Sequence, residues 1–343
     1  MTGDFTWRDA GRTVVFRRGG AEAAVDVLRE QGIDEFELLS TPRALATAGE
    51  LVAAAAGVEE VVSGQVPAAA AALLGALAPP HQASKGVRVR PLVALGGGRV
   101  VDVAKAVASV SGAEVVAIPT TMSGAEMTGS HRLPAGAEDR ASGLVRPSLV
   151  IVDPELMTSA PEGELRESSM NALAHGADTL YLPLSNPVSE MAALRGATLI
   201  AGALDQEPGA RDRAALALGS ILCGYAIDSA GMGLHHLVCQ SLVRFCDTPH
   251  AGTNAAILPH ALALLAERAP VAYEPFAAAI GTDLDGLPER ITELGRPRSL
   301  SELGGDRTKL GDAIEAMLQR PELQRVPSPP SREELTDLVA KAW

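Results

Sequence analysis

The stretch PLVALGGGRVVDVAKAVA, residues 91–108, decides how the chain folds. It begins with an apolar strand at 91–95, continues through three glycines, and predicts a helix over 100–110. The N-terminus of a helix carries unpaired N–H groups and a partial positive charge, and glycines let a pyrophosphate approach that backbone. The pattern therefore indicates a phosphate-binding loop, and a plain glycine turn between strand and helix fits it too. The spacing is not GxGxxG, so an ordinary Rossmann fingerprint is not indicated.

The alternation of short β-branched runs and alanine-rich helical stretches extends to both sides of this loop. Such alternation is typical of a parallel, doubly wound α/β sheet with right-handed crossovers. Further strands are predicted at 36–39, 59–62, 114–118 and 149–152, and further helices at 42–56 and 67–77.

The pattern changes near residue 154, where strand-like runs almost disappear. We therefore predict an α/β dinucleotide-binding domain at 1–154 and an all-α helical domain at 155–343. Helices in the second half are predicted at 162–181, 187–204, 210–236, 237–245 and 255–268. A proline-rich connector at 320–332 is expected before a last helix at 333–343.

Composition and charge argue against several classes of function. The chain has 343 residues and a formal net charge of −13, so neither nucleic acid nor an anionic membrane is an expected partner. Aromatic residues make up 3% of the chain, too few for a base-stacking platform. The three cysteines fit a reducing compartment, and the sequence shows no signal peptide and no membrane-spanning run. These features predict a cytoplasmic enzyme that acts on a small molecule.

A second polar loop is predicted beside the glycine loop. The sequence IPTTMSGAEMTGS, residues 118–130, places the hydroxyls of Thr120, Thr121 and Ser123 after a predicted strand. Ligands of open α/β sheets bind at the carboxyl ends of strands. A nucleotide crevice shared by the two loops is therefore favoured over the alternative, a helix start that these hydroxyls cap.

The strand at 36–39 ends in Ser40-Thr41-Pro42 and is not followed by an acid. A site that prefers NAD usually has Asp or Glu here to bind the ribose 2′-hydroxyl. Without that carboxylate, a 2′-phosphate meets no repulsion. We therefore expect NADPH to be accepted alongside NADH.

Histidines gather in the helical half of the chain. Asn171 and His175 share one helix face, with Asp178 three residues further on, and four more histidines lie at His235, His236, His250 and His260. Their clustering in apolar helices favours a functional site over separate structural histidines. Three imidazoles and one oxygen suit Zn²⁺ or Fe²⁺, although the neutral Asn171 weakens such a site. Imidazoles that polarise a carbonyl and act as general acid, without metal, are the alternative.

Taken in order, these motifs resemble the iron-containing alcohol dehydrogenase superfamily, and within it the maleylacetate reductases most. The order is GGG…D..K, IPTT…E.T, D-P-x-L-M, N-A-L-A-H, G-L-H-H, T-P-H and L-P-H, and it covers roughly residues 13–265. The likeness to maleylacetate reductases rests on Ser-Thr-Pro at 40–42, N-A-x-A-H at 171–175 and the double histidine at 235–236.

The resemblance implies an N-terminal α/β dinucleotide domain, a C-terminal helical domain and a cleft between them, commonly in a homodimer. It implies NADH or NADPH as the reductant of a carbonyl or an activated C=C bond; from maleylacetate the product is 3-oxoadipate. The residues implied to bind the cofactor are Gly96, Gly97, Gly98, Asp102, Thr120, Thr121, Thr128, Ser40 and Thr41. The residues implied to be catalytic are His175, His235, His236 and His250. The positions that ligate a divalent metal (Zn or Fe) in metal-dependent members are Asn171, His175, His236 and His250.

Two departures from the family pattern define an alternative function. Arg99 stands where the glycine loop usually ends in serine, and Gln240 stands where a histidine often supplies a proton. The arginine would clamp a phosphate or fill the space of the nucleotide. In the second case the chain is a non-redox biosynthetic enzyme, a cyclase or lyase on the same scaffold with a degenerate cofactor site. A binding or scaffold protein without catalysis is a third class. Arg132 or Arg140 is the expected partner of a substrate carboxylate.

Overall fold

The computed structural model describes residues 5–9, 11–77 and 89–343. The chain divides into two compact units, Met1–Ser159 and Ala160–Trp343, called unit 1 and unit 2 below. The division falls close to the boundary predicted at residue 154. Unit 1 holds the strands, and unit 2 is helical over the residues described.

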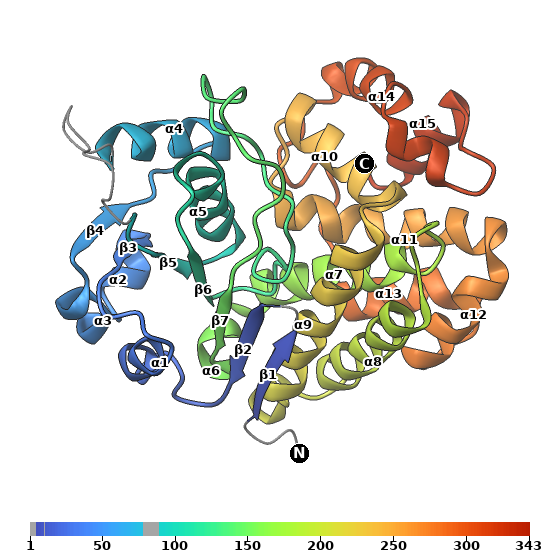
Figure 1. The fold of residues 1–343 in the computed structure, drawn as a ribbon. Coiled ribbons are helices and arrows are strands. Elements are labelled where there is room, and N and C mark those ends of the chain that lie inside the picture. The colour runs from blue at the N-terminus through green and yellow to red at the C-terminus, as the bar shows by residue number, and fades with distance from the viewer. Residues whose placement is uncertain (1–4, 10, 78–88) are drawn as a thin grey trace. The chain divides into compact units, whose positions relative to one another are not determined.

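Within the described part of unit 1, seven strands form one sheet in the order β1-β2-β7-β6-β5-β3-β4 (Figure 1). Every neighbouring pair is parallel except the hairpin of β1 and β2. The predicted parallel sheet is therefore confirmed, and the hairpin is an addition that the sequence did not reveal. The bounds are β1 Phe5–Asp9, β2 Arg12–Phe16, β3 Glu37–Ser40, β4 Gly57–Glu60, β5 Leu92–Gly96, β6 Val115–Pro119 and β7 Leu149–Val152.

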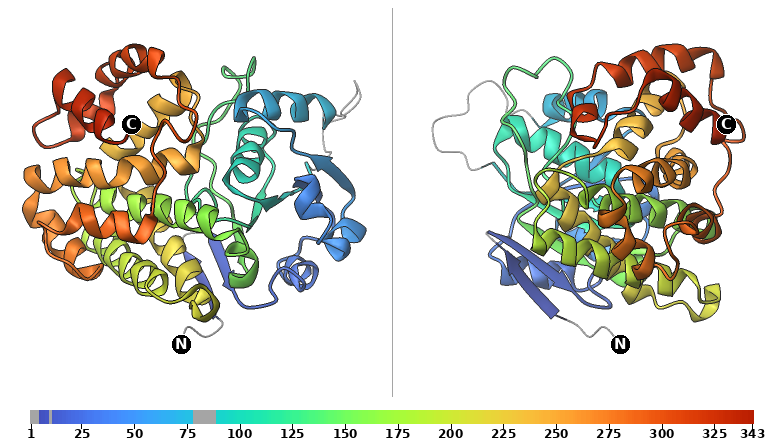
Figure 2. Two further views of the ribbon diagram at one scale, coloured as in Figure 1. Left: turned by 180° about the vertical axis from the view of Figure 1, so that it is seen from behind. Right: turned by 90° about the vertical axis from the view of Figure 1, so that its right-hand side faces the viewer.

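Helices cover both faces of this sheet (Figure 2). Val101 and Ala104 of α5 pack with α4 over one face, and Leu28 of α1 packs with Leu51 of α3 over the other. The predicted helix at 42–56 is two helices, α2 and α3. The bounds are α1 Ala24–Glu30, α2 Pro42–Leu45, α3 Gly49–Ala54, α4 Val66–Ala76, α5 Gly98–Ser111 and α6 Pro154–Met157.

The interior strand β5 and helix α5 put the glycine loop at the carboxyl edge of the sheet. All five residues of β5 are buried, which suits a strand covered on both faces. The helix starts directly after Gly97 and ends at Gly112, whose φ of 72° is the left-handed conformation that glycine adopts easily. The glycine loop is therefore held between two well-packed elements.

Unit 2 is a bundle around α7, which contacts α8, α9, α10, α11 and α13. Gly196 and Gly219 bring α8 and α9 together, because a Cβ at either position would lie within 3 Å of the backbone of the other helix. The bounds are α7 Glu162–Thr179, α8 Pro187–Leu204, η1 Pro208–Ala210, α9 Arg213–Ala230, α10 Leu234–Phe245, α11 His250–Arg268, α12 Pro270–Ala279, α13 Leu287–Gly295, η2 Arg307–Lys309, α14 Leu310–Leu318, η3 Pro321–Arg325 and α15 Arg332–Lys341.

The helix predicted over 210–236 is wrong, because the structure breaks it between α9 and α10. Gly231 has a φ of 89°, and the two helices meet at a bend of 96°. The break puts His235 and His236 on the first turn of α10. Within the described residues no single helix combines the length and apolarity needed to cross a membrane; α9 and α10 meet that test only as a bent pair, by length and composition alone.

Candidate active site

The glycine loop presents an uncapped helix N-terminus. Gly97 is the N-cap of α5 and has no side chain that could accept a hydrogen bond from the first turn. Added Cβ atoms would lie 3.2 Å from the Thr121 side chain at Gly97 and 2.7 Å from that of Ser123 at Gly98. The glycines thus allow the loop after β6, residues 120–130 and called the hydroxyl loop below, to lie against the N-terminus of α5. The N–H groups there fit an anionic group such as a pyrophosphate.

The predicted cofactor hydroxyls fall into two groups. Thr120 and Thr121 are half-buried beside the glycine loop, and the Thr120 N–H donates to the Gly96 carbonyl at 3.0 Å. Ser40 is fully buried, and its hydroxyl donates to the Leu95 carbonyl at 2.7 Å. Thr41 caps α2 through the Ala44 N–H. The geometry therefore gives Ser40 and Thr41 structural roles, while Thr120 and Thr121 stay candidates for cofactor contact.

Lys105 supports the hydroxyl loop, and sequence reasoning did not single it out although it lies in the quoted motif. Its buried ammonium pairs with Asp102 at 2.8 Å. It also donates to three carbonyls of the hydroxyl loop, those of Ala125, Thr128 and Ser130, at 2.8–3.1 Å. Asp102 and Thr128 therefore belong to a clamp that shapes the loop, which is a different role from the direct cofactor contact that the resemblance implied. A lysine buried in an apolar helix was the available signal.

The buried carboxyl of Glu126 lies in the same loop. Burial raises its pKa to about 7, against the opposing effects of its own backbone N–H and of Lys105. One carboxyl oxygen has no hydrogen-bond partner, and the other faces the Ser123 hydroxyl at 3.4 Å. Glu126 is thus close to half ionised near neutral pH.

The raised pKa of Glu126 predicts that the folding stability of the protein depends on pH. The pKa of Glu126 in the folded protein lies above that of an unfolded glutamate. The contribution of this group to folding stability is therefore fully present below about pH 4.5 and is lost as the pH rises through about 7. Over that window the loss is about 3 kcal/mol. Glu126→Gln should therefore raise the thermal midpoint relative to the wild type at pH 8 and not at pH 4.5. A constant difference across this range would contradict the prediction.

The imidazoles of His175, His235 and His236 come together as predicted from the clustering of histidines in the sequence. The His175 ring on α7 stacks on His236 with centroids 4.7 Å apart and planes 6° from parallel. The rings of His235 and His236 are 5.0 Å apart, edge to face. His250 begins α11 and is exposed, and electrostatic interaction with it is among the smaller causes that lower the pKa of both His175 and His236.

Asp178 and Tyr181 hold the N-terminus of α10, and neither was predicted as a site residue. The Asp178 carboxylate accepts the N–H groups of Gly233, His235 and His236 at 3.2–3.4 Å. The Tyr181 hydroxyl accepts the Leu234 N–H at 2.6 Å. Four orphan N–H groups are thereby satisfied from α7 and the turn after it. A Cβ at Gly233 would lie 2.2 Å from the Tyr181 oxygen, so only glycine fits there.

The same carboxylate fixes the proton of His236. The His236 Nδ1 lies 2.7 Å from the Asp178 Oδ2, so Nδ1 carries the hydrogen that the carboxylate accepts. Burial is the main cause that lowers the pKa of His236 to about 3, and it also lowers that of His175 well below its usual range. Burial raises the pKa of Asp178, and the N–H groups of α10 oppose that rise. Neutral His236 therefore presents a lone pair at Nε2, and this buried atom has no hydrogen-bond partner.

A lone pair at Nε2 discriminates between the two chemical interpretations. It accepts a cation or a proton and cannot donate to an oxyanion, so it favours a divalent metal over an imidazole acid. Asp178, His235 and His236 offer ligand atoms within 4.8 Å of one another, but the carboxylate is occupied by N–H groups. The residues present thus fit a metal with His236 as a ligand and Asp178 behind it, an arrangement common for metal-bound histidines.

His235 has a different environment from its neighbour. Its ring is buried, and Nε2 lies 3.0 Å from the Asn254 carbonyl and 3.5 Å from the Cys239 thiol. Burial lowers the pKa of His235 to about 4. These contacts join α10 to α11 and give His235 a structural role in place of the catalytic role implied by the resemblance. Gln240, which lies on α10 and departs from the family pattern, accepts a hydrogen bond from Arg320 at 2.9 Å.

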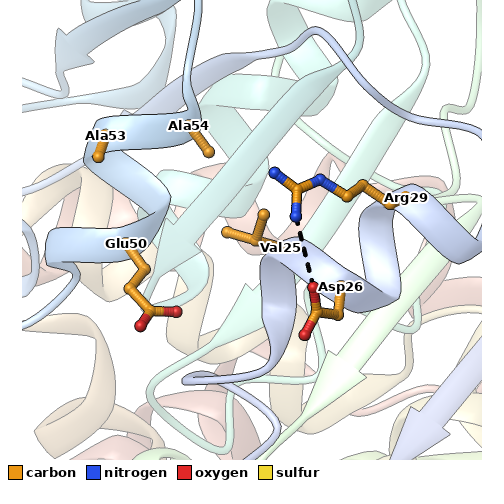
Figure 3. A pocket seen from close by; sticks show the side chains of 6 residues that line it. All are labelled: Val25, Asp26, Arg29, Glu50, Ala53 and Ala54. Atoms are coloured by element: carbon orange, nitrogen blue, oxygen red, sulfur yellow. Dashed lines mark hydrogen bonds and ion pairs between the residues drawn. The ribbon is translucent and has the colours of Figure 1, made fainter.

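Two surface pockets are lined neither by the glycine and hydroxyl loops nor by the histidines. One of about 320 Å³ lies in unit 1, and Figure 3 shows Val25, the Asp26–Arg29 ion pair and Glu50 around it. The other, of about 520 Å³, lies between α8 and α12 and is lined by Tyr181 and Arg268 among others. The first contains no residue of the glycine or hydroxyl loops, and the second none of the histidines, so neither is the candidate site.

Comparison with known proteins matches both units to one family. Residues 15–161 match the family model for iron-containing alcohol dehydrogenase, and residues 166–343 match that for the C-terminal part of the Fe-containing alcohol dehydrogenase family. A maleylacetate reductase of Rhizobium sp. (strain MTP-10005) is 31% identical over 328 residues, which is 92% of this chain and 90% of that protein.

Solved structures agree with this match. The crystal structure of maleylacetate reductase from Agrobacterium tumefaciens is similar with a TM-score of 0.81 and 29% identity, covering 100% of this chain and 99% of that one. A sulfoacetaldehyde reductase from Bifidobacterium kashiwanohense, solved in complex with NAD⁺, has a TM-score of 0.80 with the same coverage. At 21% identity this second likeness shows the fold alone.

Proposed function

The chain belongs to the iron-containing alcohol dehydrogenase family of oxidoreductases, and we propose that it is an NAD(P)H-dependent reductase of a small, carboxylated carbonyl compound or activated alkene. The observation that carries the proposal is the Asp178–His236 pair, which leaves a buried imidazole lone pair beside His175. The uncapped, glycine-lined start of α5 supports a dinucleotide as the second component. A homodimer is part of the proposal.

The proposed reaction is hydride transfer from C4 of the reduced nicotinamide. The hydride adds to a carbonyl carbon, or to an alkene carbon β to a ketone, and the electron pair moves to the carbonyl oxygen. A proton from water then adds to the alkoxide oxygen, which gives the alcohol, or to the α-carbon of the enolate, which gives the saturated ketone; oxidised nicotinamide remains.

A divalent metal fits the imidazole cluster, as described above. Asn171, His175, His236 and His250 would hold it, and when bound it would polarise the substrate oxygen as a Lewis acid. Asp178 keeps the His236 Nε2 deprotonated by holding the hydrogen on Nδ1. Tyr181 and Asp178 keep the first turn of α10 fixed, so His236 needs little reorganisation on binding.

The substrate class rests on the similarity to maleylacetate reductases. Of the two arginines expected to bind a substrate carboxylate, Arg132 donates to the Gln65 side chain at 2.6 Å, so its guanidinium already has one fixed partner. Because the similarity is to maleylacetate reductases, maleylacetate is the first substrate to test, followed by other short oxo acids.

The non-redox alternative loses the feature that motivated it. It requires the Arg99 side chain to fill the pyrophosphate site at the N-terminus of α5. Instead, the Arg99 guanidinium donates to the Val62 carbonyl, beyond the end of β4, at 3.1 Å. The side chain therefore extends away from the glycines and leaves them open to a ligand.

Dinucleotide binding tests the proposal, and Gly97 offers a sharp variant. Gly97→Val should weaken NADH and NADPH binding by at least about tenfold, because the added methyls collide with Thr121 and block the anion. Gly75→Val in α4, where a Cβ meets nothing within 4 Å, is the matched control. Calorimetric titration gives the dissociation constants. A wild-type protein that binds neither nucleotide at millimolar concentration contradicts the proposed function.

A further inference from the structure

The Arg99 side chain reaches from the start of α5 to the loop after β4. In the sheet, β3 lies between β5 and β4. Arg99 follows β5 on the first turn of α5, and its Nη1 reaches the Val62 carbonyl after β4 at 3.1 Å. Because β3 separates the two strands in the sheet, this hydrogen bond holds the guanidinium on the side of the sheet where β3 ends. A guanidinium is thus held beside the place where β3 ends.

A second guanidinium is held at the same loop. Arg132 donates to the Gln65 side chain at 2.6 Å, three residues after Val62. Both arginines are thus bound to neutral oxygens, and within the described chain no carboxylate forms an ion pair with either of them. The acids of β4, Glu59 and Glu60, precede the loop. Two positive charges without counter-charges therefore flank residues 62–65.

The end of β3 offers no acid, and Arg43 in the short helix that follows is a further exposed cation there. Ser40 uses its hydroxyl on the Leu95 carbonyl, and Thr41 caps α2. In doubly wound dinucleotide folds, an acid at the end of this strand binds the ribose 2′-hydroxyl, whereas a nearby arginine accommodates a 2′-phosphate. This chain has the arginine and lacks the acid.

We propose that Arg99 is the residue that determines cofactor specificity, that it binds the 2′-phosphate of NADPH, and that the enzyme prefers NADPH to NADH. This inference rests on the proposed function, because it requires a dinucleotide on the glycine loop. The Val62 carbonyl occupies one of the five N–H donors of Arg99, and the others stay available for phosphate oxygens. Arg132 adds charge from the other end of the loop.

The test is the ratio of two dissociation constants. Calorimetry with NADPH and NADH should show NADPH binding at least about tenfold tighter to the wild type, the effect of one charge-assisted contact. Arg99→Gln should weaken NADPH about 10- to 100-fold and leave NADH within about threefold. Arg99→Lys keeps the charge and should retain part of the preference. Adenosine 2′,5′-bisphosphate and 5′-AMP repeat the comparison without the nicotinamide half.

Control variants separate the possible failures. Arg90→Gln removes a positive charge before the start of β5, where Arg90 pairs with Glu37, and should change neither constant. Equal losses of NADH and NADPH in Arg99→Gln would assign Arg99 to the pyrophosphate and overturn the inference. So would a loss confined to Arg43→Gln, or equal affinities in the wild type. Absence of binding by either nucleotide in the wild type would instead contradict the proposed function itself. Thermal midpoints show that each variant is folded.

Discussion

Asp178→Asn is expected to lower kcat/KM for NADPH-dependent reduction about 100- to 10,000-fold, as loss of a carboxylate behind a working histidine does elsewhere. The carboxylate accepts the His236 Nδ1 hydrogen at 2.7 Å and three N–H groups of the α10 N-terminus. In asparagine, the side-chain NH₂ replaces one of the two carboxylate oxygens. This NH₂ faces N–H groups that need an acceptor. His236 then turns or takes the other tautomer, and its Nε2 no longer offers a lone pair.

The measurement separates a positioning role from a merely structural one. Steady-state kinetics should show the loss in kcat, with the NADPH dissociation constant unchanged because unit 1 is untouched. The lost caps should also lower stability by about 1–2 kcal/mol. Asp205→Asn, which breaks a surface pair with Arg290, is the matched control and should leave kcat within about twofold. A small kcat effect in Asp178→Asn would disprove the role assigned to this carboxylate.

His236→Ala and His235→Ala should differ sharply, although the two residues are neighbours. His236 presents an unpartnered Nε2 beside His175, so its loss should lower kcat/KM by about 1,000-fold or more. His235 holds the Asn254 carbonyl, so its loss should cost about 1–3 kcal/mol of stability and less than about tenfold in kcat/KM.

Rates measured at one temperature, with thermal midpoints for both variants, decide between the two histidines. His236→Ala should lose most of its kcat/KM while its thermal midpoint falls less than that of His235→Ala. If His235→Ala is the inactive variant and His236→Ala the active one, the assignment of roles is reversed. Full activity in both variants would revive a function that does not use the imidazoles.

The elements that the sequence predicted well are those with local signals. The buried run of β7, Leu149–Val152, and helix α8, Pro187–Leu204, have the predicted bounds. The strand β2 was not predicted; it pairs with its neighbour β1 on one side and, on the other, with β7, more than a hundred residues away, with Thr13 opposite Leu149. A short strand that contains Arg12 and pairs with distant residues leaves no periodic pattern of its own.

The candidate site was predicted in its histidines and not in its supporting residues. Apolar helical pattern continues on both sides of Gly231 and Gly233, so one helix was predicted, although these two glycines were a signal of the break. Asp178 was noted only as a neighbour on the helix face. Its role depends on contacts with a segment 55 residues later in the chain, which spacing along a helix does not indicate. The same holds for Lys105 and the carbonyls that it binds.

Transfer of deuterium from NADPH tests the central claim most directly. NADPH labelled with deuterium on the transferred position of C4 is mixed with maleylacetate and enzyme, and the product is examined by mass spectrometry. The account predicts a wild-type product heavier by one deuterium, and almost none from His236→Ala although that variant still binds NADPH. Product without the label, or equal labelled product from both proteins, would contradict it.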